Sequence, residues 1–156
     1  MNIINKKAIA IIVLSVIAIN YSCKKSNVST TDTSALLQNK NWKITALTMN
    51  PGYFGITDVL NGLFFDCEKD DIYEFNANGN FVLDNGSTKC APTDPQTQTG
   101  SWNYNSSSKN LHFEIINAGI MHDINISTIN ETVFTGTSKD TLSDGVHTST
   151  WTFTKQ

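Results

Sequence analysis

The fold class is decided by residues 71–84, which read DIYEFNANGNFVLD. Apolar and polar residues alternate on both sides of a loop rich in Asn and Gly, which is the pattern of two half-buried strands. A three-residue loop with Gly79 in the left-handed conformation would join them. This loop pairs the apolar side chains as follows: Phe75 with Phe81 and Tyr73 with Leu83. The stretch therefore predicts an antiparallel hairpin with one apolar face.

The same alternation continues along the chain between turn signals, and no segment has the period of a long helix. We predict strands over residues 42–49, 71–76, 80–84, 97–104, 111–117, 120–128, 132–142 and 146–154. Eight consecutive strands predict an all-β fold, an eight-stranded up-and-down antiparallel barrel.

Turn chemistry then predicts the register of the later strands. A turn at Asp144-Gly145 places Trp151 opposite Ser138 and Phe153 opposite Gly136. A turn at Ala118-Gly119 aligns Phe113 with Ile124 and Ile115 with His122. The remaining predicted pairs are Tyr104 with Leu111, Trp102 with Phe113, and Ile126 with Phe134. These pairs stack the inward side chains in three layers, as expected for a barrel.

The two ends of such a barrel differ. Trp42, on the first strand, would lie near Phe153 at an aromatic end. Alternating strand direction brings the two long connections, residues 50–70 and 85–96, to the other end. Each connection carries one cysteine, so we expect a disulfide between Cys67 and Cys90, worth about 3 kcal/mol by loop closure.

The N-terminus has the features of an export signal. Lys6 and Lys7 precede the apolar run 8–19, and Ser22 is the small residue before Cys23. Twelve apolar residues are fewer than the roughly 20 that span a bilayer. The segment resembles a bacterial lipoprotein signal peptide, which implies that Cys23 is acylated and attaches the protein to a membrane.

This interpretation divides the chain into three parts. Residues 1–22 would be the signal peptide, residues 23–34 a lipidated tether, and residues 35–156 one barrel domain. We expect an outer-membrane lipoprotein of the cell envelope that faces the periplasm or the cell surface.

Composition narrows the classes of partner. The chain contains no Arg, and removal of Lys6 and Lys7 leaves nine Lys against fourteen Asp and Glu. Arg is the preferred side chain for phosphate and base recognition, so we expect no nucleic-acid partner. We also expect a monomer without a cofactor.

Several short patterns occur together at matching positions: Leu36-Leu37, Trp42-Lys43-Ile44-Thr45, Cys67 before Asp70-Asp71-Ile72-Tyr73, Gly79, Cys90, Gly100-Ser101-Trp102 and Trp151-Thr152-Phe153. In these features residues 35–156 resemble the lipocalin-like lipoproteins of Gram-negative bacteria. The resemblance implies a lipocalin-like barrel preceded by a short N-terminal helical turn. It also implies that the barrel binds a small apolar molecule.

The predicted register places a candidate apolar site at the end that carries the long loops. Gly100 and Gly136 would leave space beside its inward side chains. The lining would be Tyr73, Trp102, Ile115, His122 and Trp151. The cover would be Phe54, Leu63 and Phe64, from the apolar first connection. The alternative is a core filled by its own side chains, because an eight-stranded barrel is only just wide enough for one small ligand.

Other functions have weaker support. Asp66, Glu68, Asp70 and Asp71 form an acidic cluster that could bind a cation such as Ca²⁺, or simply be a solvated rim.

Motifs of hydrolases, metalloproteases and phosphate-binding loops are absent, so we expect no enzyme and no metal site. A packed barrel without a ligand, acting as an interaction or structural module of the cell envelope, remains the alternative function.

Overall fold

The structure is a computed structural model that describes residues 32–156, so the predicted signal peptide, most of the predicted tether and Cys23 lie outside the described residues. Its elements are helices α1 (Thr33–Leu37) and α2 (Val59–Gly62) and strands β1 (Asn41–Tyr53), β2 (Ile56–Asp58), β3 (Ile72–Phe75), β4 (Asn80–Asp84), β5 (Thr97–Asn105), β6 (Asn110–Ile115), β7 (Ile120–Ile129), β8 (Val133–Leu142) and β9 (Gly145–Lys155). Short 3₁₀ turns cover Asp66–Glu68 and Ile116–Ala118. Within residues 32–156, no helix is long and apolar enough to cross a membrane.

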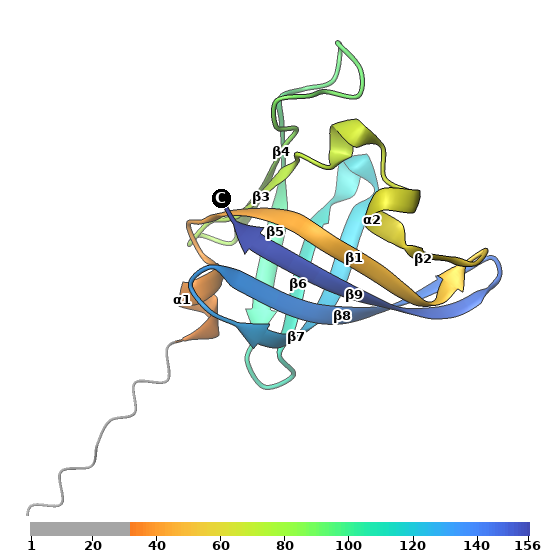
Figure 1. Ribbon diagram of the computed structural model, residues 1–156. Coiled ribbons are helices and arrows are strands. Elements are labelled where there is room, and N and C mark those ends of the chain that lie inside the picture. The colour runs from red at the N-terminus through yellow and green to blue at the C-terminus, as the bar shows by residue number, and fades with distance from the viewer. Residues whose placement is uncertain (1–31) are drawn as a thin grey trace, which may run out of the picture. The chain divides into compact units, whose positions relative to one another are not determined.

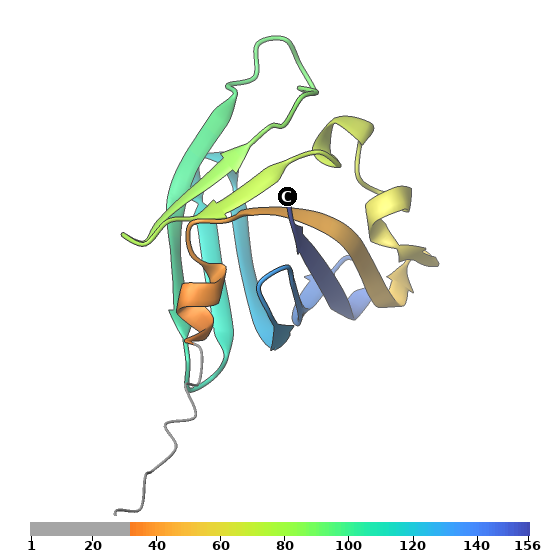
Figure 2. The ribbon, with the colours of Figure 1, turned by 60° about the vertical axis from the view of Figure 1, so that its left-hand side comes forward.

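Eight of the strands form a closed antiparallel ring. The strands follow one another in sequence from β3 to β9, and β1 pairs with both β3 and β9. The ring is visible from two sides in Figures 1 and 2. The ninth strand, β2, is a three-residue addition that pairs with the far half of β1. The predicted eight-stranded barrel is therefore confirmed, and β2 is the strand that the sequence did not reveal.

The hairpin of residues 71–84 has the predicted register. Phe75 pairs with Phe81 and Tyr73 with Leu83, and Gly79 has φ = 80°. In β5–β6, Tyr104 pairs with Leu111 and Trp102 pairs with Phe113, as predicted. The predicted register of both hairpins is therefore confirmed.

Two later hairpins differ from the prediction by two residues. In β6–β7, Phe113 pairs with His122 and Ile115 with Ile120, because a 3₁₀ turn and left-handed Gly119 make the loop four residues long. In β8–β9, Trp151 pairs with Gly136, Phe153 with Phe134 and Ser149 with Ser138. That turn consists of Ser143 and Asp144, since Leu142 pairs with Gly145.

The β7–β8 register was also wrong. Ile126 pairs with Gly136 rather than with Phe134, which lies opposite Ile129 beyond an irregularity between Ile126 and Thr128. Side chains alternate with a period of two along a strand. A shift of two residues therefore leaves the same face inward, and the predicted inner faces survive these errors.

The end of the barrel next to α1 is closed by aromatic packing. Trp42, Phe75, Phe134 and Phe153 have no exposed surface. The rings of Phe134 and Phe153 stack at 4.4 Å, and Trp42 meets Phe134 edge-on at 4.9 Å. The Trp42 indole Nε1 donates a hydrogen bond to the Leu37 carbonyl at 2.9 Å, which joins β1 to α1.

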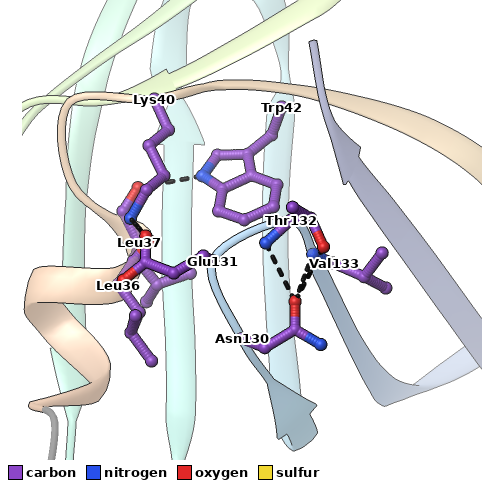
Figure 3. A network of polar contacts seen from close by, with 8 residues as sticks. All are labelled: Leu36, Leu37, Lys40, Trp42, Asn130, Glu131, Thr132 and Val133. Carbon is purple, nitrogen blue, oxygen red and sulfur yellow. Dashed lines mark hydrogen bonds and ion pairs between the residues drawn. The ribbon is translucent and has the colours of Figure 1, made fainter.

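A polar frame surrounds this packed end (Figure 3). The Lys40 ammonium donates to the Leu36 carbonyl at 2.7 Å and lies 3.1 Å from a Glu131 carboxylate oxygen. In the β7–β8 turn, Asn130 Oδ1 accepts hydrogen bonds from the backbone amides of Thr132 and Val133, both at 2.9 Å. These contacts connect α1, β1 and the β7–β8 turn. We refer to this region as the closed end.

The opposite end carries α2, the 85–96 connection and the β6–β7 turn (Figures 1 and 2). We refer to it as the loop end. The predicted disulfide is confirmed: Cys67 and Cys90 are bonded, with their Cα atoms 5.1 Å apart. It links the segment before β3 to the connection between β4 and β5.

Candidate functional site

The loop end contains a cavity of about 470 Å³. Its apolar lining comprises Phe64, Tyr73, Leu83, Pro95 and Ile120. Its polar lining comprises Glu68, Asp71, Asn85, Asp94, Gln98 and His122. The Cys67–Cys90 disulfide completes the wall. The volume lies within the range of roughly 300–1,000 Å³ that is typical of small-molecule sites.

The barrel strands build the rigid wall of this cavity. Tyr73 on β3 is 8% exposed and packs against Phe153 at 5.5 Å and against Phe81 and Phe113, both at 6.1 Å. Burial raises the pKa of the Tyr73 phenol, so the ring remains neutral. The cavity thus rests directly on the aromatic core.

The His122 side chain lies between the cavity and Trp151 on β9. Its ring lies 5.1 Å from that of Phe113 and 4.9 Å from that of Trp151. Burial lowers the pKa of His122, so the imidazole is neutral near pH 7. Behind it, the Trp151 indole donates to Ser138 Oγ at 2.9 Å. Trp151 therefore contacts the lining residue His122 but does not itself line the cavity.

The rim is held by polar contacts as well as by the disulfide. Asp70 Oδ2 accepts hydrogen bonds from the Ser87 amide at 2.9 Å, the Ser87 hydroxyl at 2.6 Å and the Thr88 amide at 3.1 Å. The bond from the Ser87 hydroxyl is the main cause that lowers the pKa of Asp70. Together with the Cys67–Cys90 bond, these contacts attach the 85–96 connection to the segment before β3.

Asp71 is different from its neighbour. It is only 9% exposed, lines the cavity, and receives no side-chain hydrogen bond from residues 32–156. Burial is the main cause that raises the pKa of Asp71 to about 7, and the charges of Asp70, Glu68 and Asp84 add to it. The Asp71 carboxylate thus has no hydrogen-bond partner among the described residues and remains accessible from the cavity, whereas the described carboxylate oxygen that is buried without a partner is Asp70 Oδ1.

The acidic cluster considered from the sequence is divided among different partners. Asp66 is exposed and pairs with the Lys69 ammonium at 2.8 Å, while Asp70 bonds to Ser87 and Asp71 faces the cavity. No group of three or more His, Cys, Asp or Glu side chains in the described residues could hold a metal ion.

The structure brings together three of the eight side chains predicted for the site: Phe64, Tyr73 and His122 line the cavity. Ile115 and Trp151 are buried and do not line it. Trp102 lies away from it, because its indole donates to the Asn76 carbonyl at the β3–β4 turn.

The predicted cover is also different. Phe54 is 71% exposed in the tight β1–β2 turn, and Leu63 is 39% exposed beside α2. Neither side chain lines the cavity. Of the three residues proposed as a cover, only Phe64 reaches it.

The two glycines do not create the space. A Cβ on Gly100 would collide with the Glu114 carbonyl, and one on Gly136 would lie 2.5 Å from Ile124 Cγ2. These glycines allow neighbouring strands to approach closely. The cavity is instead lined jointly by barrel strands and by the two loops that follow α2 and β4.

Most of the polar side chains that line the cavity were not among the site residues predicted from the sequence. Asp71 could have been found, because residues 71, 73 and 75 alternate on one strand and the last two face inward. Asn85 and Asp94 lie in the 85–96 connection, where no periodic pattern predicts orientation.

Residues 39–136 match the family described as a lipocalin-like domain. No curated protein matches the chain in sequence. Among solved structures, bovine odorant-binding protein with undecanal is similar at 14% identity and a TM-score of 0.43, over 80% of this chain and 74% of that chain. The same bovine protein with a selenium-containing odorant gives 14% identity and a TM-score of 0.42, over 79% and 72%.

Proposed function

The chain belongs to the lipocalin-like domain family, and from this premise we propose that it binds a small hydrophobic molecule at the loop end of the barrel. The observation that carries the proposal is the cavity of about 470 Å³, whose apolar wall is built on β3, β4 and β7. Small-molecule sites are commonly concave, mainly apolar and located in the mouths of β-barrels. The proposed function is binding without catalysis.

The construction of the wall supports binding to a site that exists before the ligand arrives. Tyr73 and Leu83 are held by the sheet, and the disulfide and the Asp70–Ser87 bonds hold the loops. Burial of apolar surface contributes about 25 cal/mol per Å². A preformed site loses less of that free energy to ordering the protein.

Calorimetric titration of the soluble domain with medium-chain alcohols and aldehydes tests the proposal. Ile120→Trp should fill the cavity and weaken binding by about tenfold or more. Met121→Trp is the matched control, because Met121 is the next residue on β7 and is 64% exposed. Native mass spectrometry of the purified domain provides an independent test for a ligand that is retained. Failure of every apolar compound to bind the wild-type domain would contradict the proposal.

We also propose that the protein is an outer-membrane lipoprotein, attached through acyl chains on Cys23 and facing the periplasm or the cell surface. The basic residues, apolar run and Ser22-Cys23 sequence support this. Cys23→Ser should move the protein from the membrane fraction to the soluble fraction. The double variant Cys67→Ser, Cys90→Ser is the control and should stay with the membrane. Retention of Cys23→Ser in the membrane would refute the anchor.

A second candidate function, an interaction module of the cell envelope, has one observation in its favour. Several large apolar side chains are exposed in turns and near the starts of β7 and β9: Phe54, Phe65, Ile116, Met121 and Val146. The closed ring offers no long unpaired strand edge, so we expect a monomer in solution. Sedimentation of the purified domain tests whether it is a monomer. Chemical crosslinking of the wild-type protein and of Phe65→Ser in membranes would reveal a partner whose binding depends on these side chains.

A further inference from the structure

Asp71 and Asp70 are adjacent in sequence, but their environments differ. Asp70 is stabilised by three hydrogen bonds from Ser87 and Thr88. Asp71 is 9% exposed as a residue, no described side chain or backbone amide donates to its carboxylate, and its oxygens remain accessible from the cavity. A largely desolvated carboxylate without a hydrogen-bond donor is costly, and a donor that enters the cavity would lower that cost.

The direction in which Asp71 faces identifies where a partner would come from. Its side chain lines the cavity, next to the apolar surfaces of Tyr73 and Leu83. A molecule in the cavity would therefore contact the apolar wall and the carboxylate together. Glu68 and Asp94 line the same cavity and add negative charge.

No described basic side chain neutralises this charge. Lys69 pairs with Asp66 at 2.8 Å, and the Lys89 ammonium donates to the Asp94 backbone carbonyl at 2.8 Å. His122, the basic group in the lining, is neutral because its burial lowers its pKa. The other charged groups near Asp71 are the carboxylates of Glu68, Asp70 and Asp84, which disfavour its ionised form.

We propose that the ligand of this cavity is a cationic amphiphile, an amine with an alkyl or aryl body, whose ammonium group pairs with Asp71 while its apolar body contacts Tyr73, Leu83 and Ile120. This inference rests on the proposed function and specifies the chemical class of the ligand. An ammonium group supplies the hydrogen-bond donors that Asp71 lacks and offsets the charge of the acidic lining. An apolar body is required because a free metal cation would make no use of the apolar wall.

Three compounds with the same chain and different head groups test the inference: octylamine, octanol and octanoate, titrated calorimetrically at pH 8. Octylamine should bind about tenfold more tightly than octanol, as expected for a charge-assisted hydrogen bond, and octanoate should bind most weakly. At pH 5.5, where Asp71 is protonated, the advantage of octylamine over octanol should fall several-fold.

Asp71→Asn should reduce the advantage of octylamine to about twofold or less and leave the affinity for octanol nearly unchanged. The matched control is Asp123→Asn, which removes the same charge from an exposed position on β7 and should retain the preference. Thermal unfolding of each variant at pH 8 verifies that it is folded.

The outcomes are distinct. Equal binding of octylamine and octanol, or tightest binding of octanoate, would overturn the inference and leave the proposed function standing. Retention of the amine preference in Asp71→Asn would also overturn it. Failure of all three compounds to bind the wild-type domain would overturn the inference and the proposed function together.

Discussion

The closed end and the loop end of this barrel are built from the same strands but by different means. At the closed end, aromatic rings of Trp42, Phe134 and Phe153 fill the interior, and hydrogen bonds to α1 seal it. At the loop end, a disulfide and a few polar contacts hold two connections around a cavity. We infer from this difference that the closed end contributes more of the free energy of folding, whereas the loop end contains a carboxylate without a hydrogen-bond donor, that of Asp71.

Trp42→Ala should give the largest change if the closed end carries the stability. It removes a fully buried ring and its hydrogen bond to the Leu37 carbonyl, and should lower the free energy of unfolding by about 3–5 kcal/mol in urea denaturation. Trp42→Phe keeps most of the apolar volume and should cost less. A loss below about 1 kcal/mol for Trp42→Ala would contradict the inference that the closed end carries most of the stability.

The double variant Cys67→Ser, Cys90→Ser examines the loop end. The sequence separation of 23 predicts a loss of at most about 3 kcal/mol. Hydrogen exchange should accelerate mainly in the segment before β3 and in residues 85–96, with little change in β8 and β9 at the closed end. Uniform acceleration across the barrel would show that the two ends are not energetically separate. Reduction of the wild-type protein should reproduce the effect of the variant.

Asp71→Asn should stabilise the protein at high pH, in contrast to the two losses above. Between pH 4 and pH 7 the unfolded Asp71 releases its proton while the folded one keeps it, so the wild-type protein loses stability relative to the variant as pH rises. Above pH 7 the difference should be constant, of order 1–3 kcal/mol after allowance for cavity water. Urea denaturation of both proteins at pH 4 and pH 8 measures it. Equal stability at pH 8 would mean that Asp71 already has a partner in the folded protein.

The smallest expected effect on stability comes from the contacts of His147, which lies beside the β8–β9 turn. Its Nδ1 lies 2.7 Å from the Pro51 carbonyl and its Nε2 lies 2.8 Å from Asp144 Oδ1. Both partners accept hydrogen bonds, so the doubly protonated ring is favoured and the pKa of His147 is raised, chiefly by the Pro51 carbonyl. This contribution to stability is present below about pH 6.5 and is lost as pH rises through the higher folded pKa.

NMR titration of His147 in the variant Asp144→Asn measures this effect. The pKa of His147 should fall towards its ordinary value, although the Pro51 bond should preserve part of the increase. Asp123→Asn, which removes a charge from the outside of β7, should leave the His147 titration unchanged. An unaltered His147 titration in Asp144→Asn would show that this turn does not depend on the ion pair.

The sequence predicted the ring of strands well, because the alternation of apolar residues is a direct consequence of the period of a strand. It predicted the β3–β4 register because a loop ending in Gly79 has one favoured geometry. The later registers were wrong by two residues because alternation is unchanged by such a shift. At the β8–β9 turn, Asp144 accepts a hydrogen bond from the Phe54 amide, which is 90 residues away, so local sequence alone does not determine the contacts of this turn.

The candidate site was predicted less well for a related reason. Tyr73 and His122 lie on strands, whose pattern shows that they face inward, and both line the cavity. Asn85, Asp94 and Glu68 lie in loops whose shape depends on the disulfide and on the Asp70 contacts. Phe54 was expected to cover the cavity because it is apolar, but an apolar side chain in a tight turn can remain in solvent.

The pairing of β1 with β9 also constrains how this protein can be made. Trp42 lies opposite Lys155, so the ring joins two strands separated by almost the whole described chain. Contacts of such long sequence separation form late and slow the folding rate. Until Gly145–Lys155 have been synthesised, the edges of both β1 and β8 remain open to pairing with other molecules. Until β9 is available to pair with both strands, the chain is therefore more prone to association through these edges than the closed barrel is.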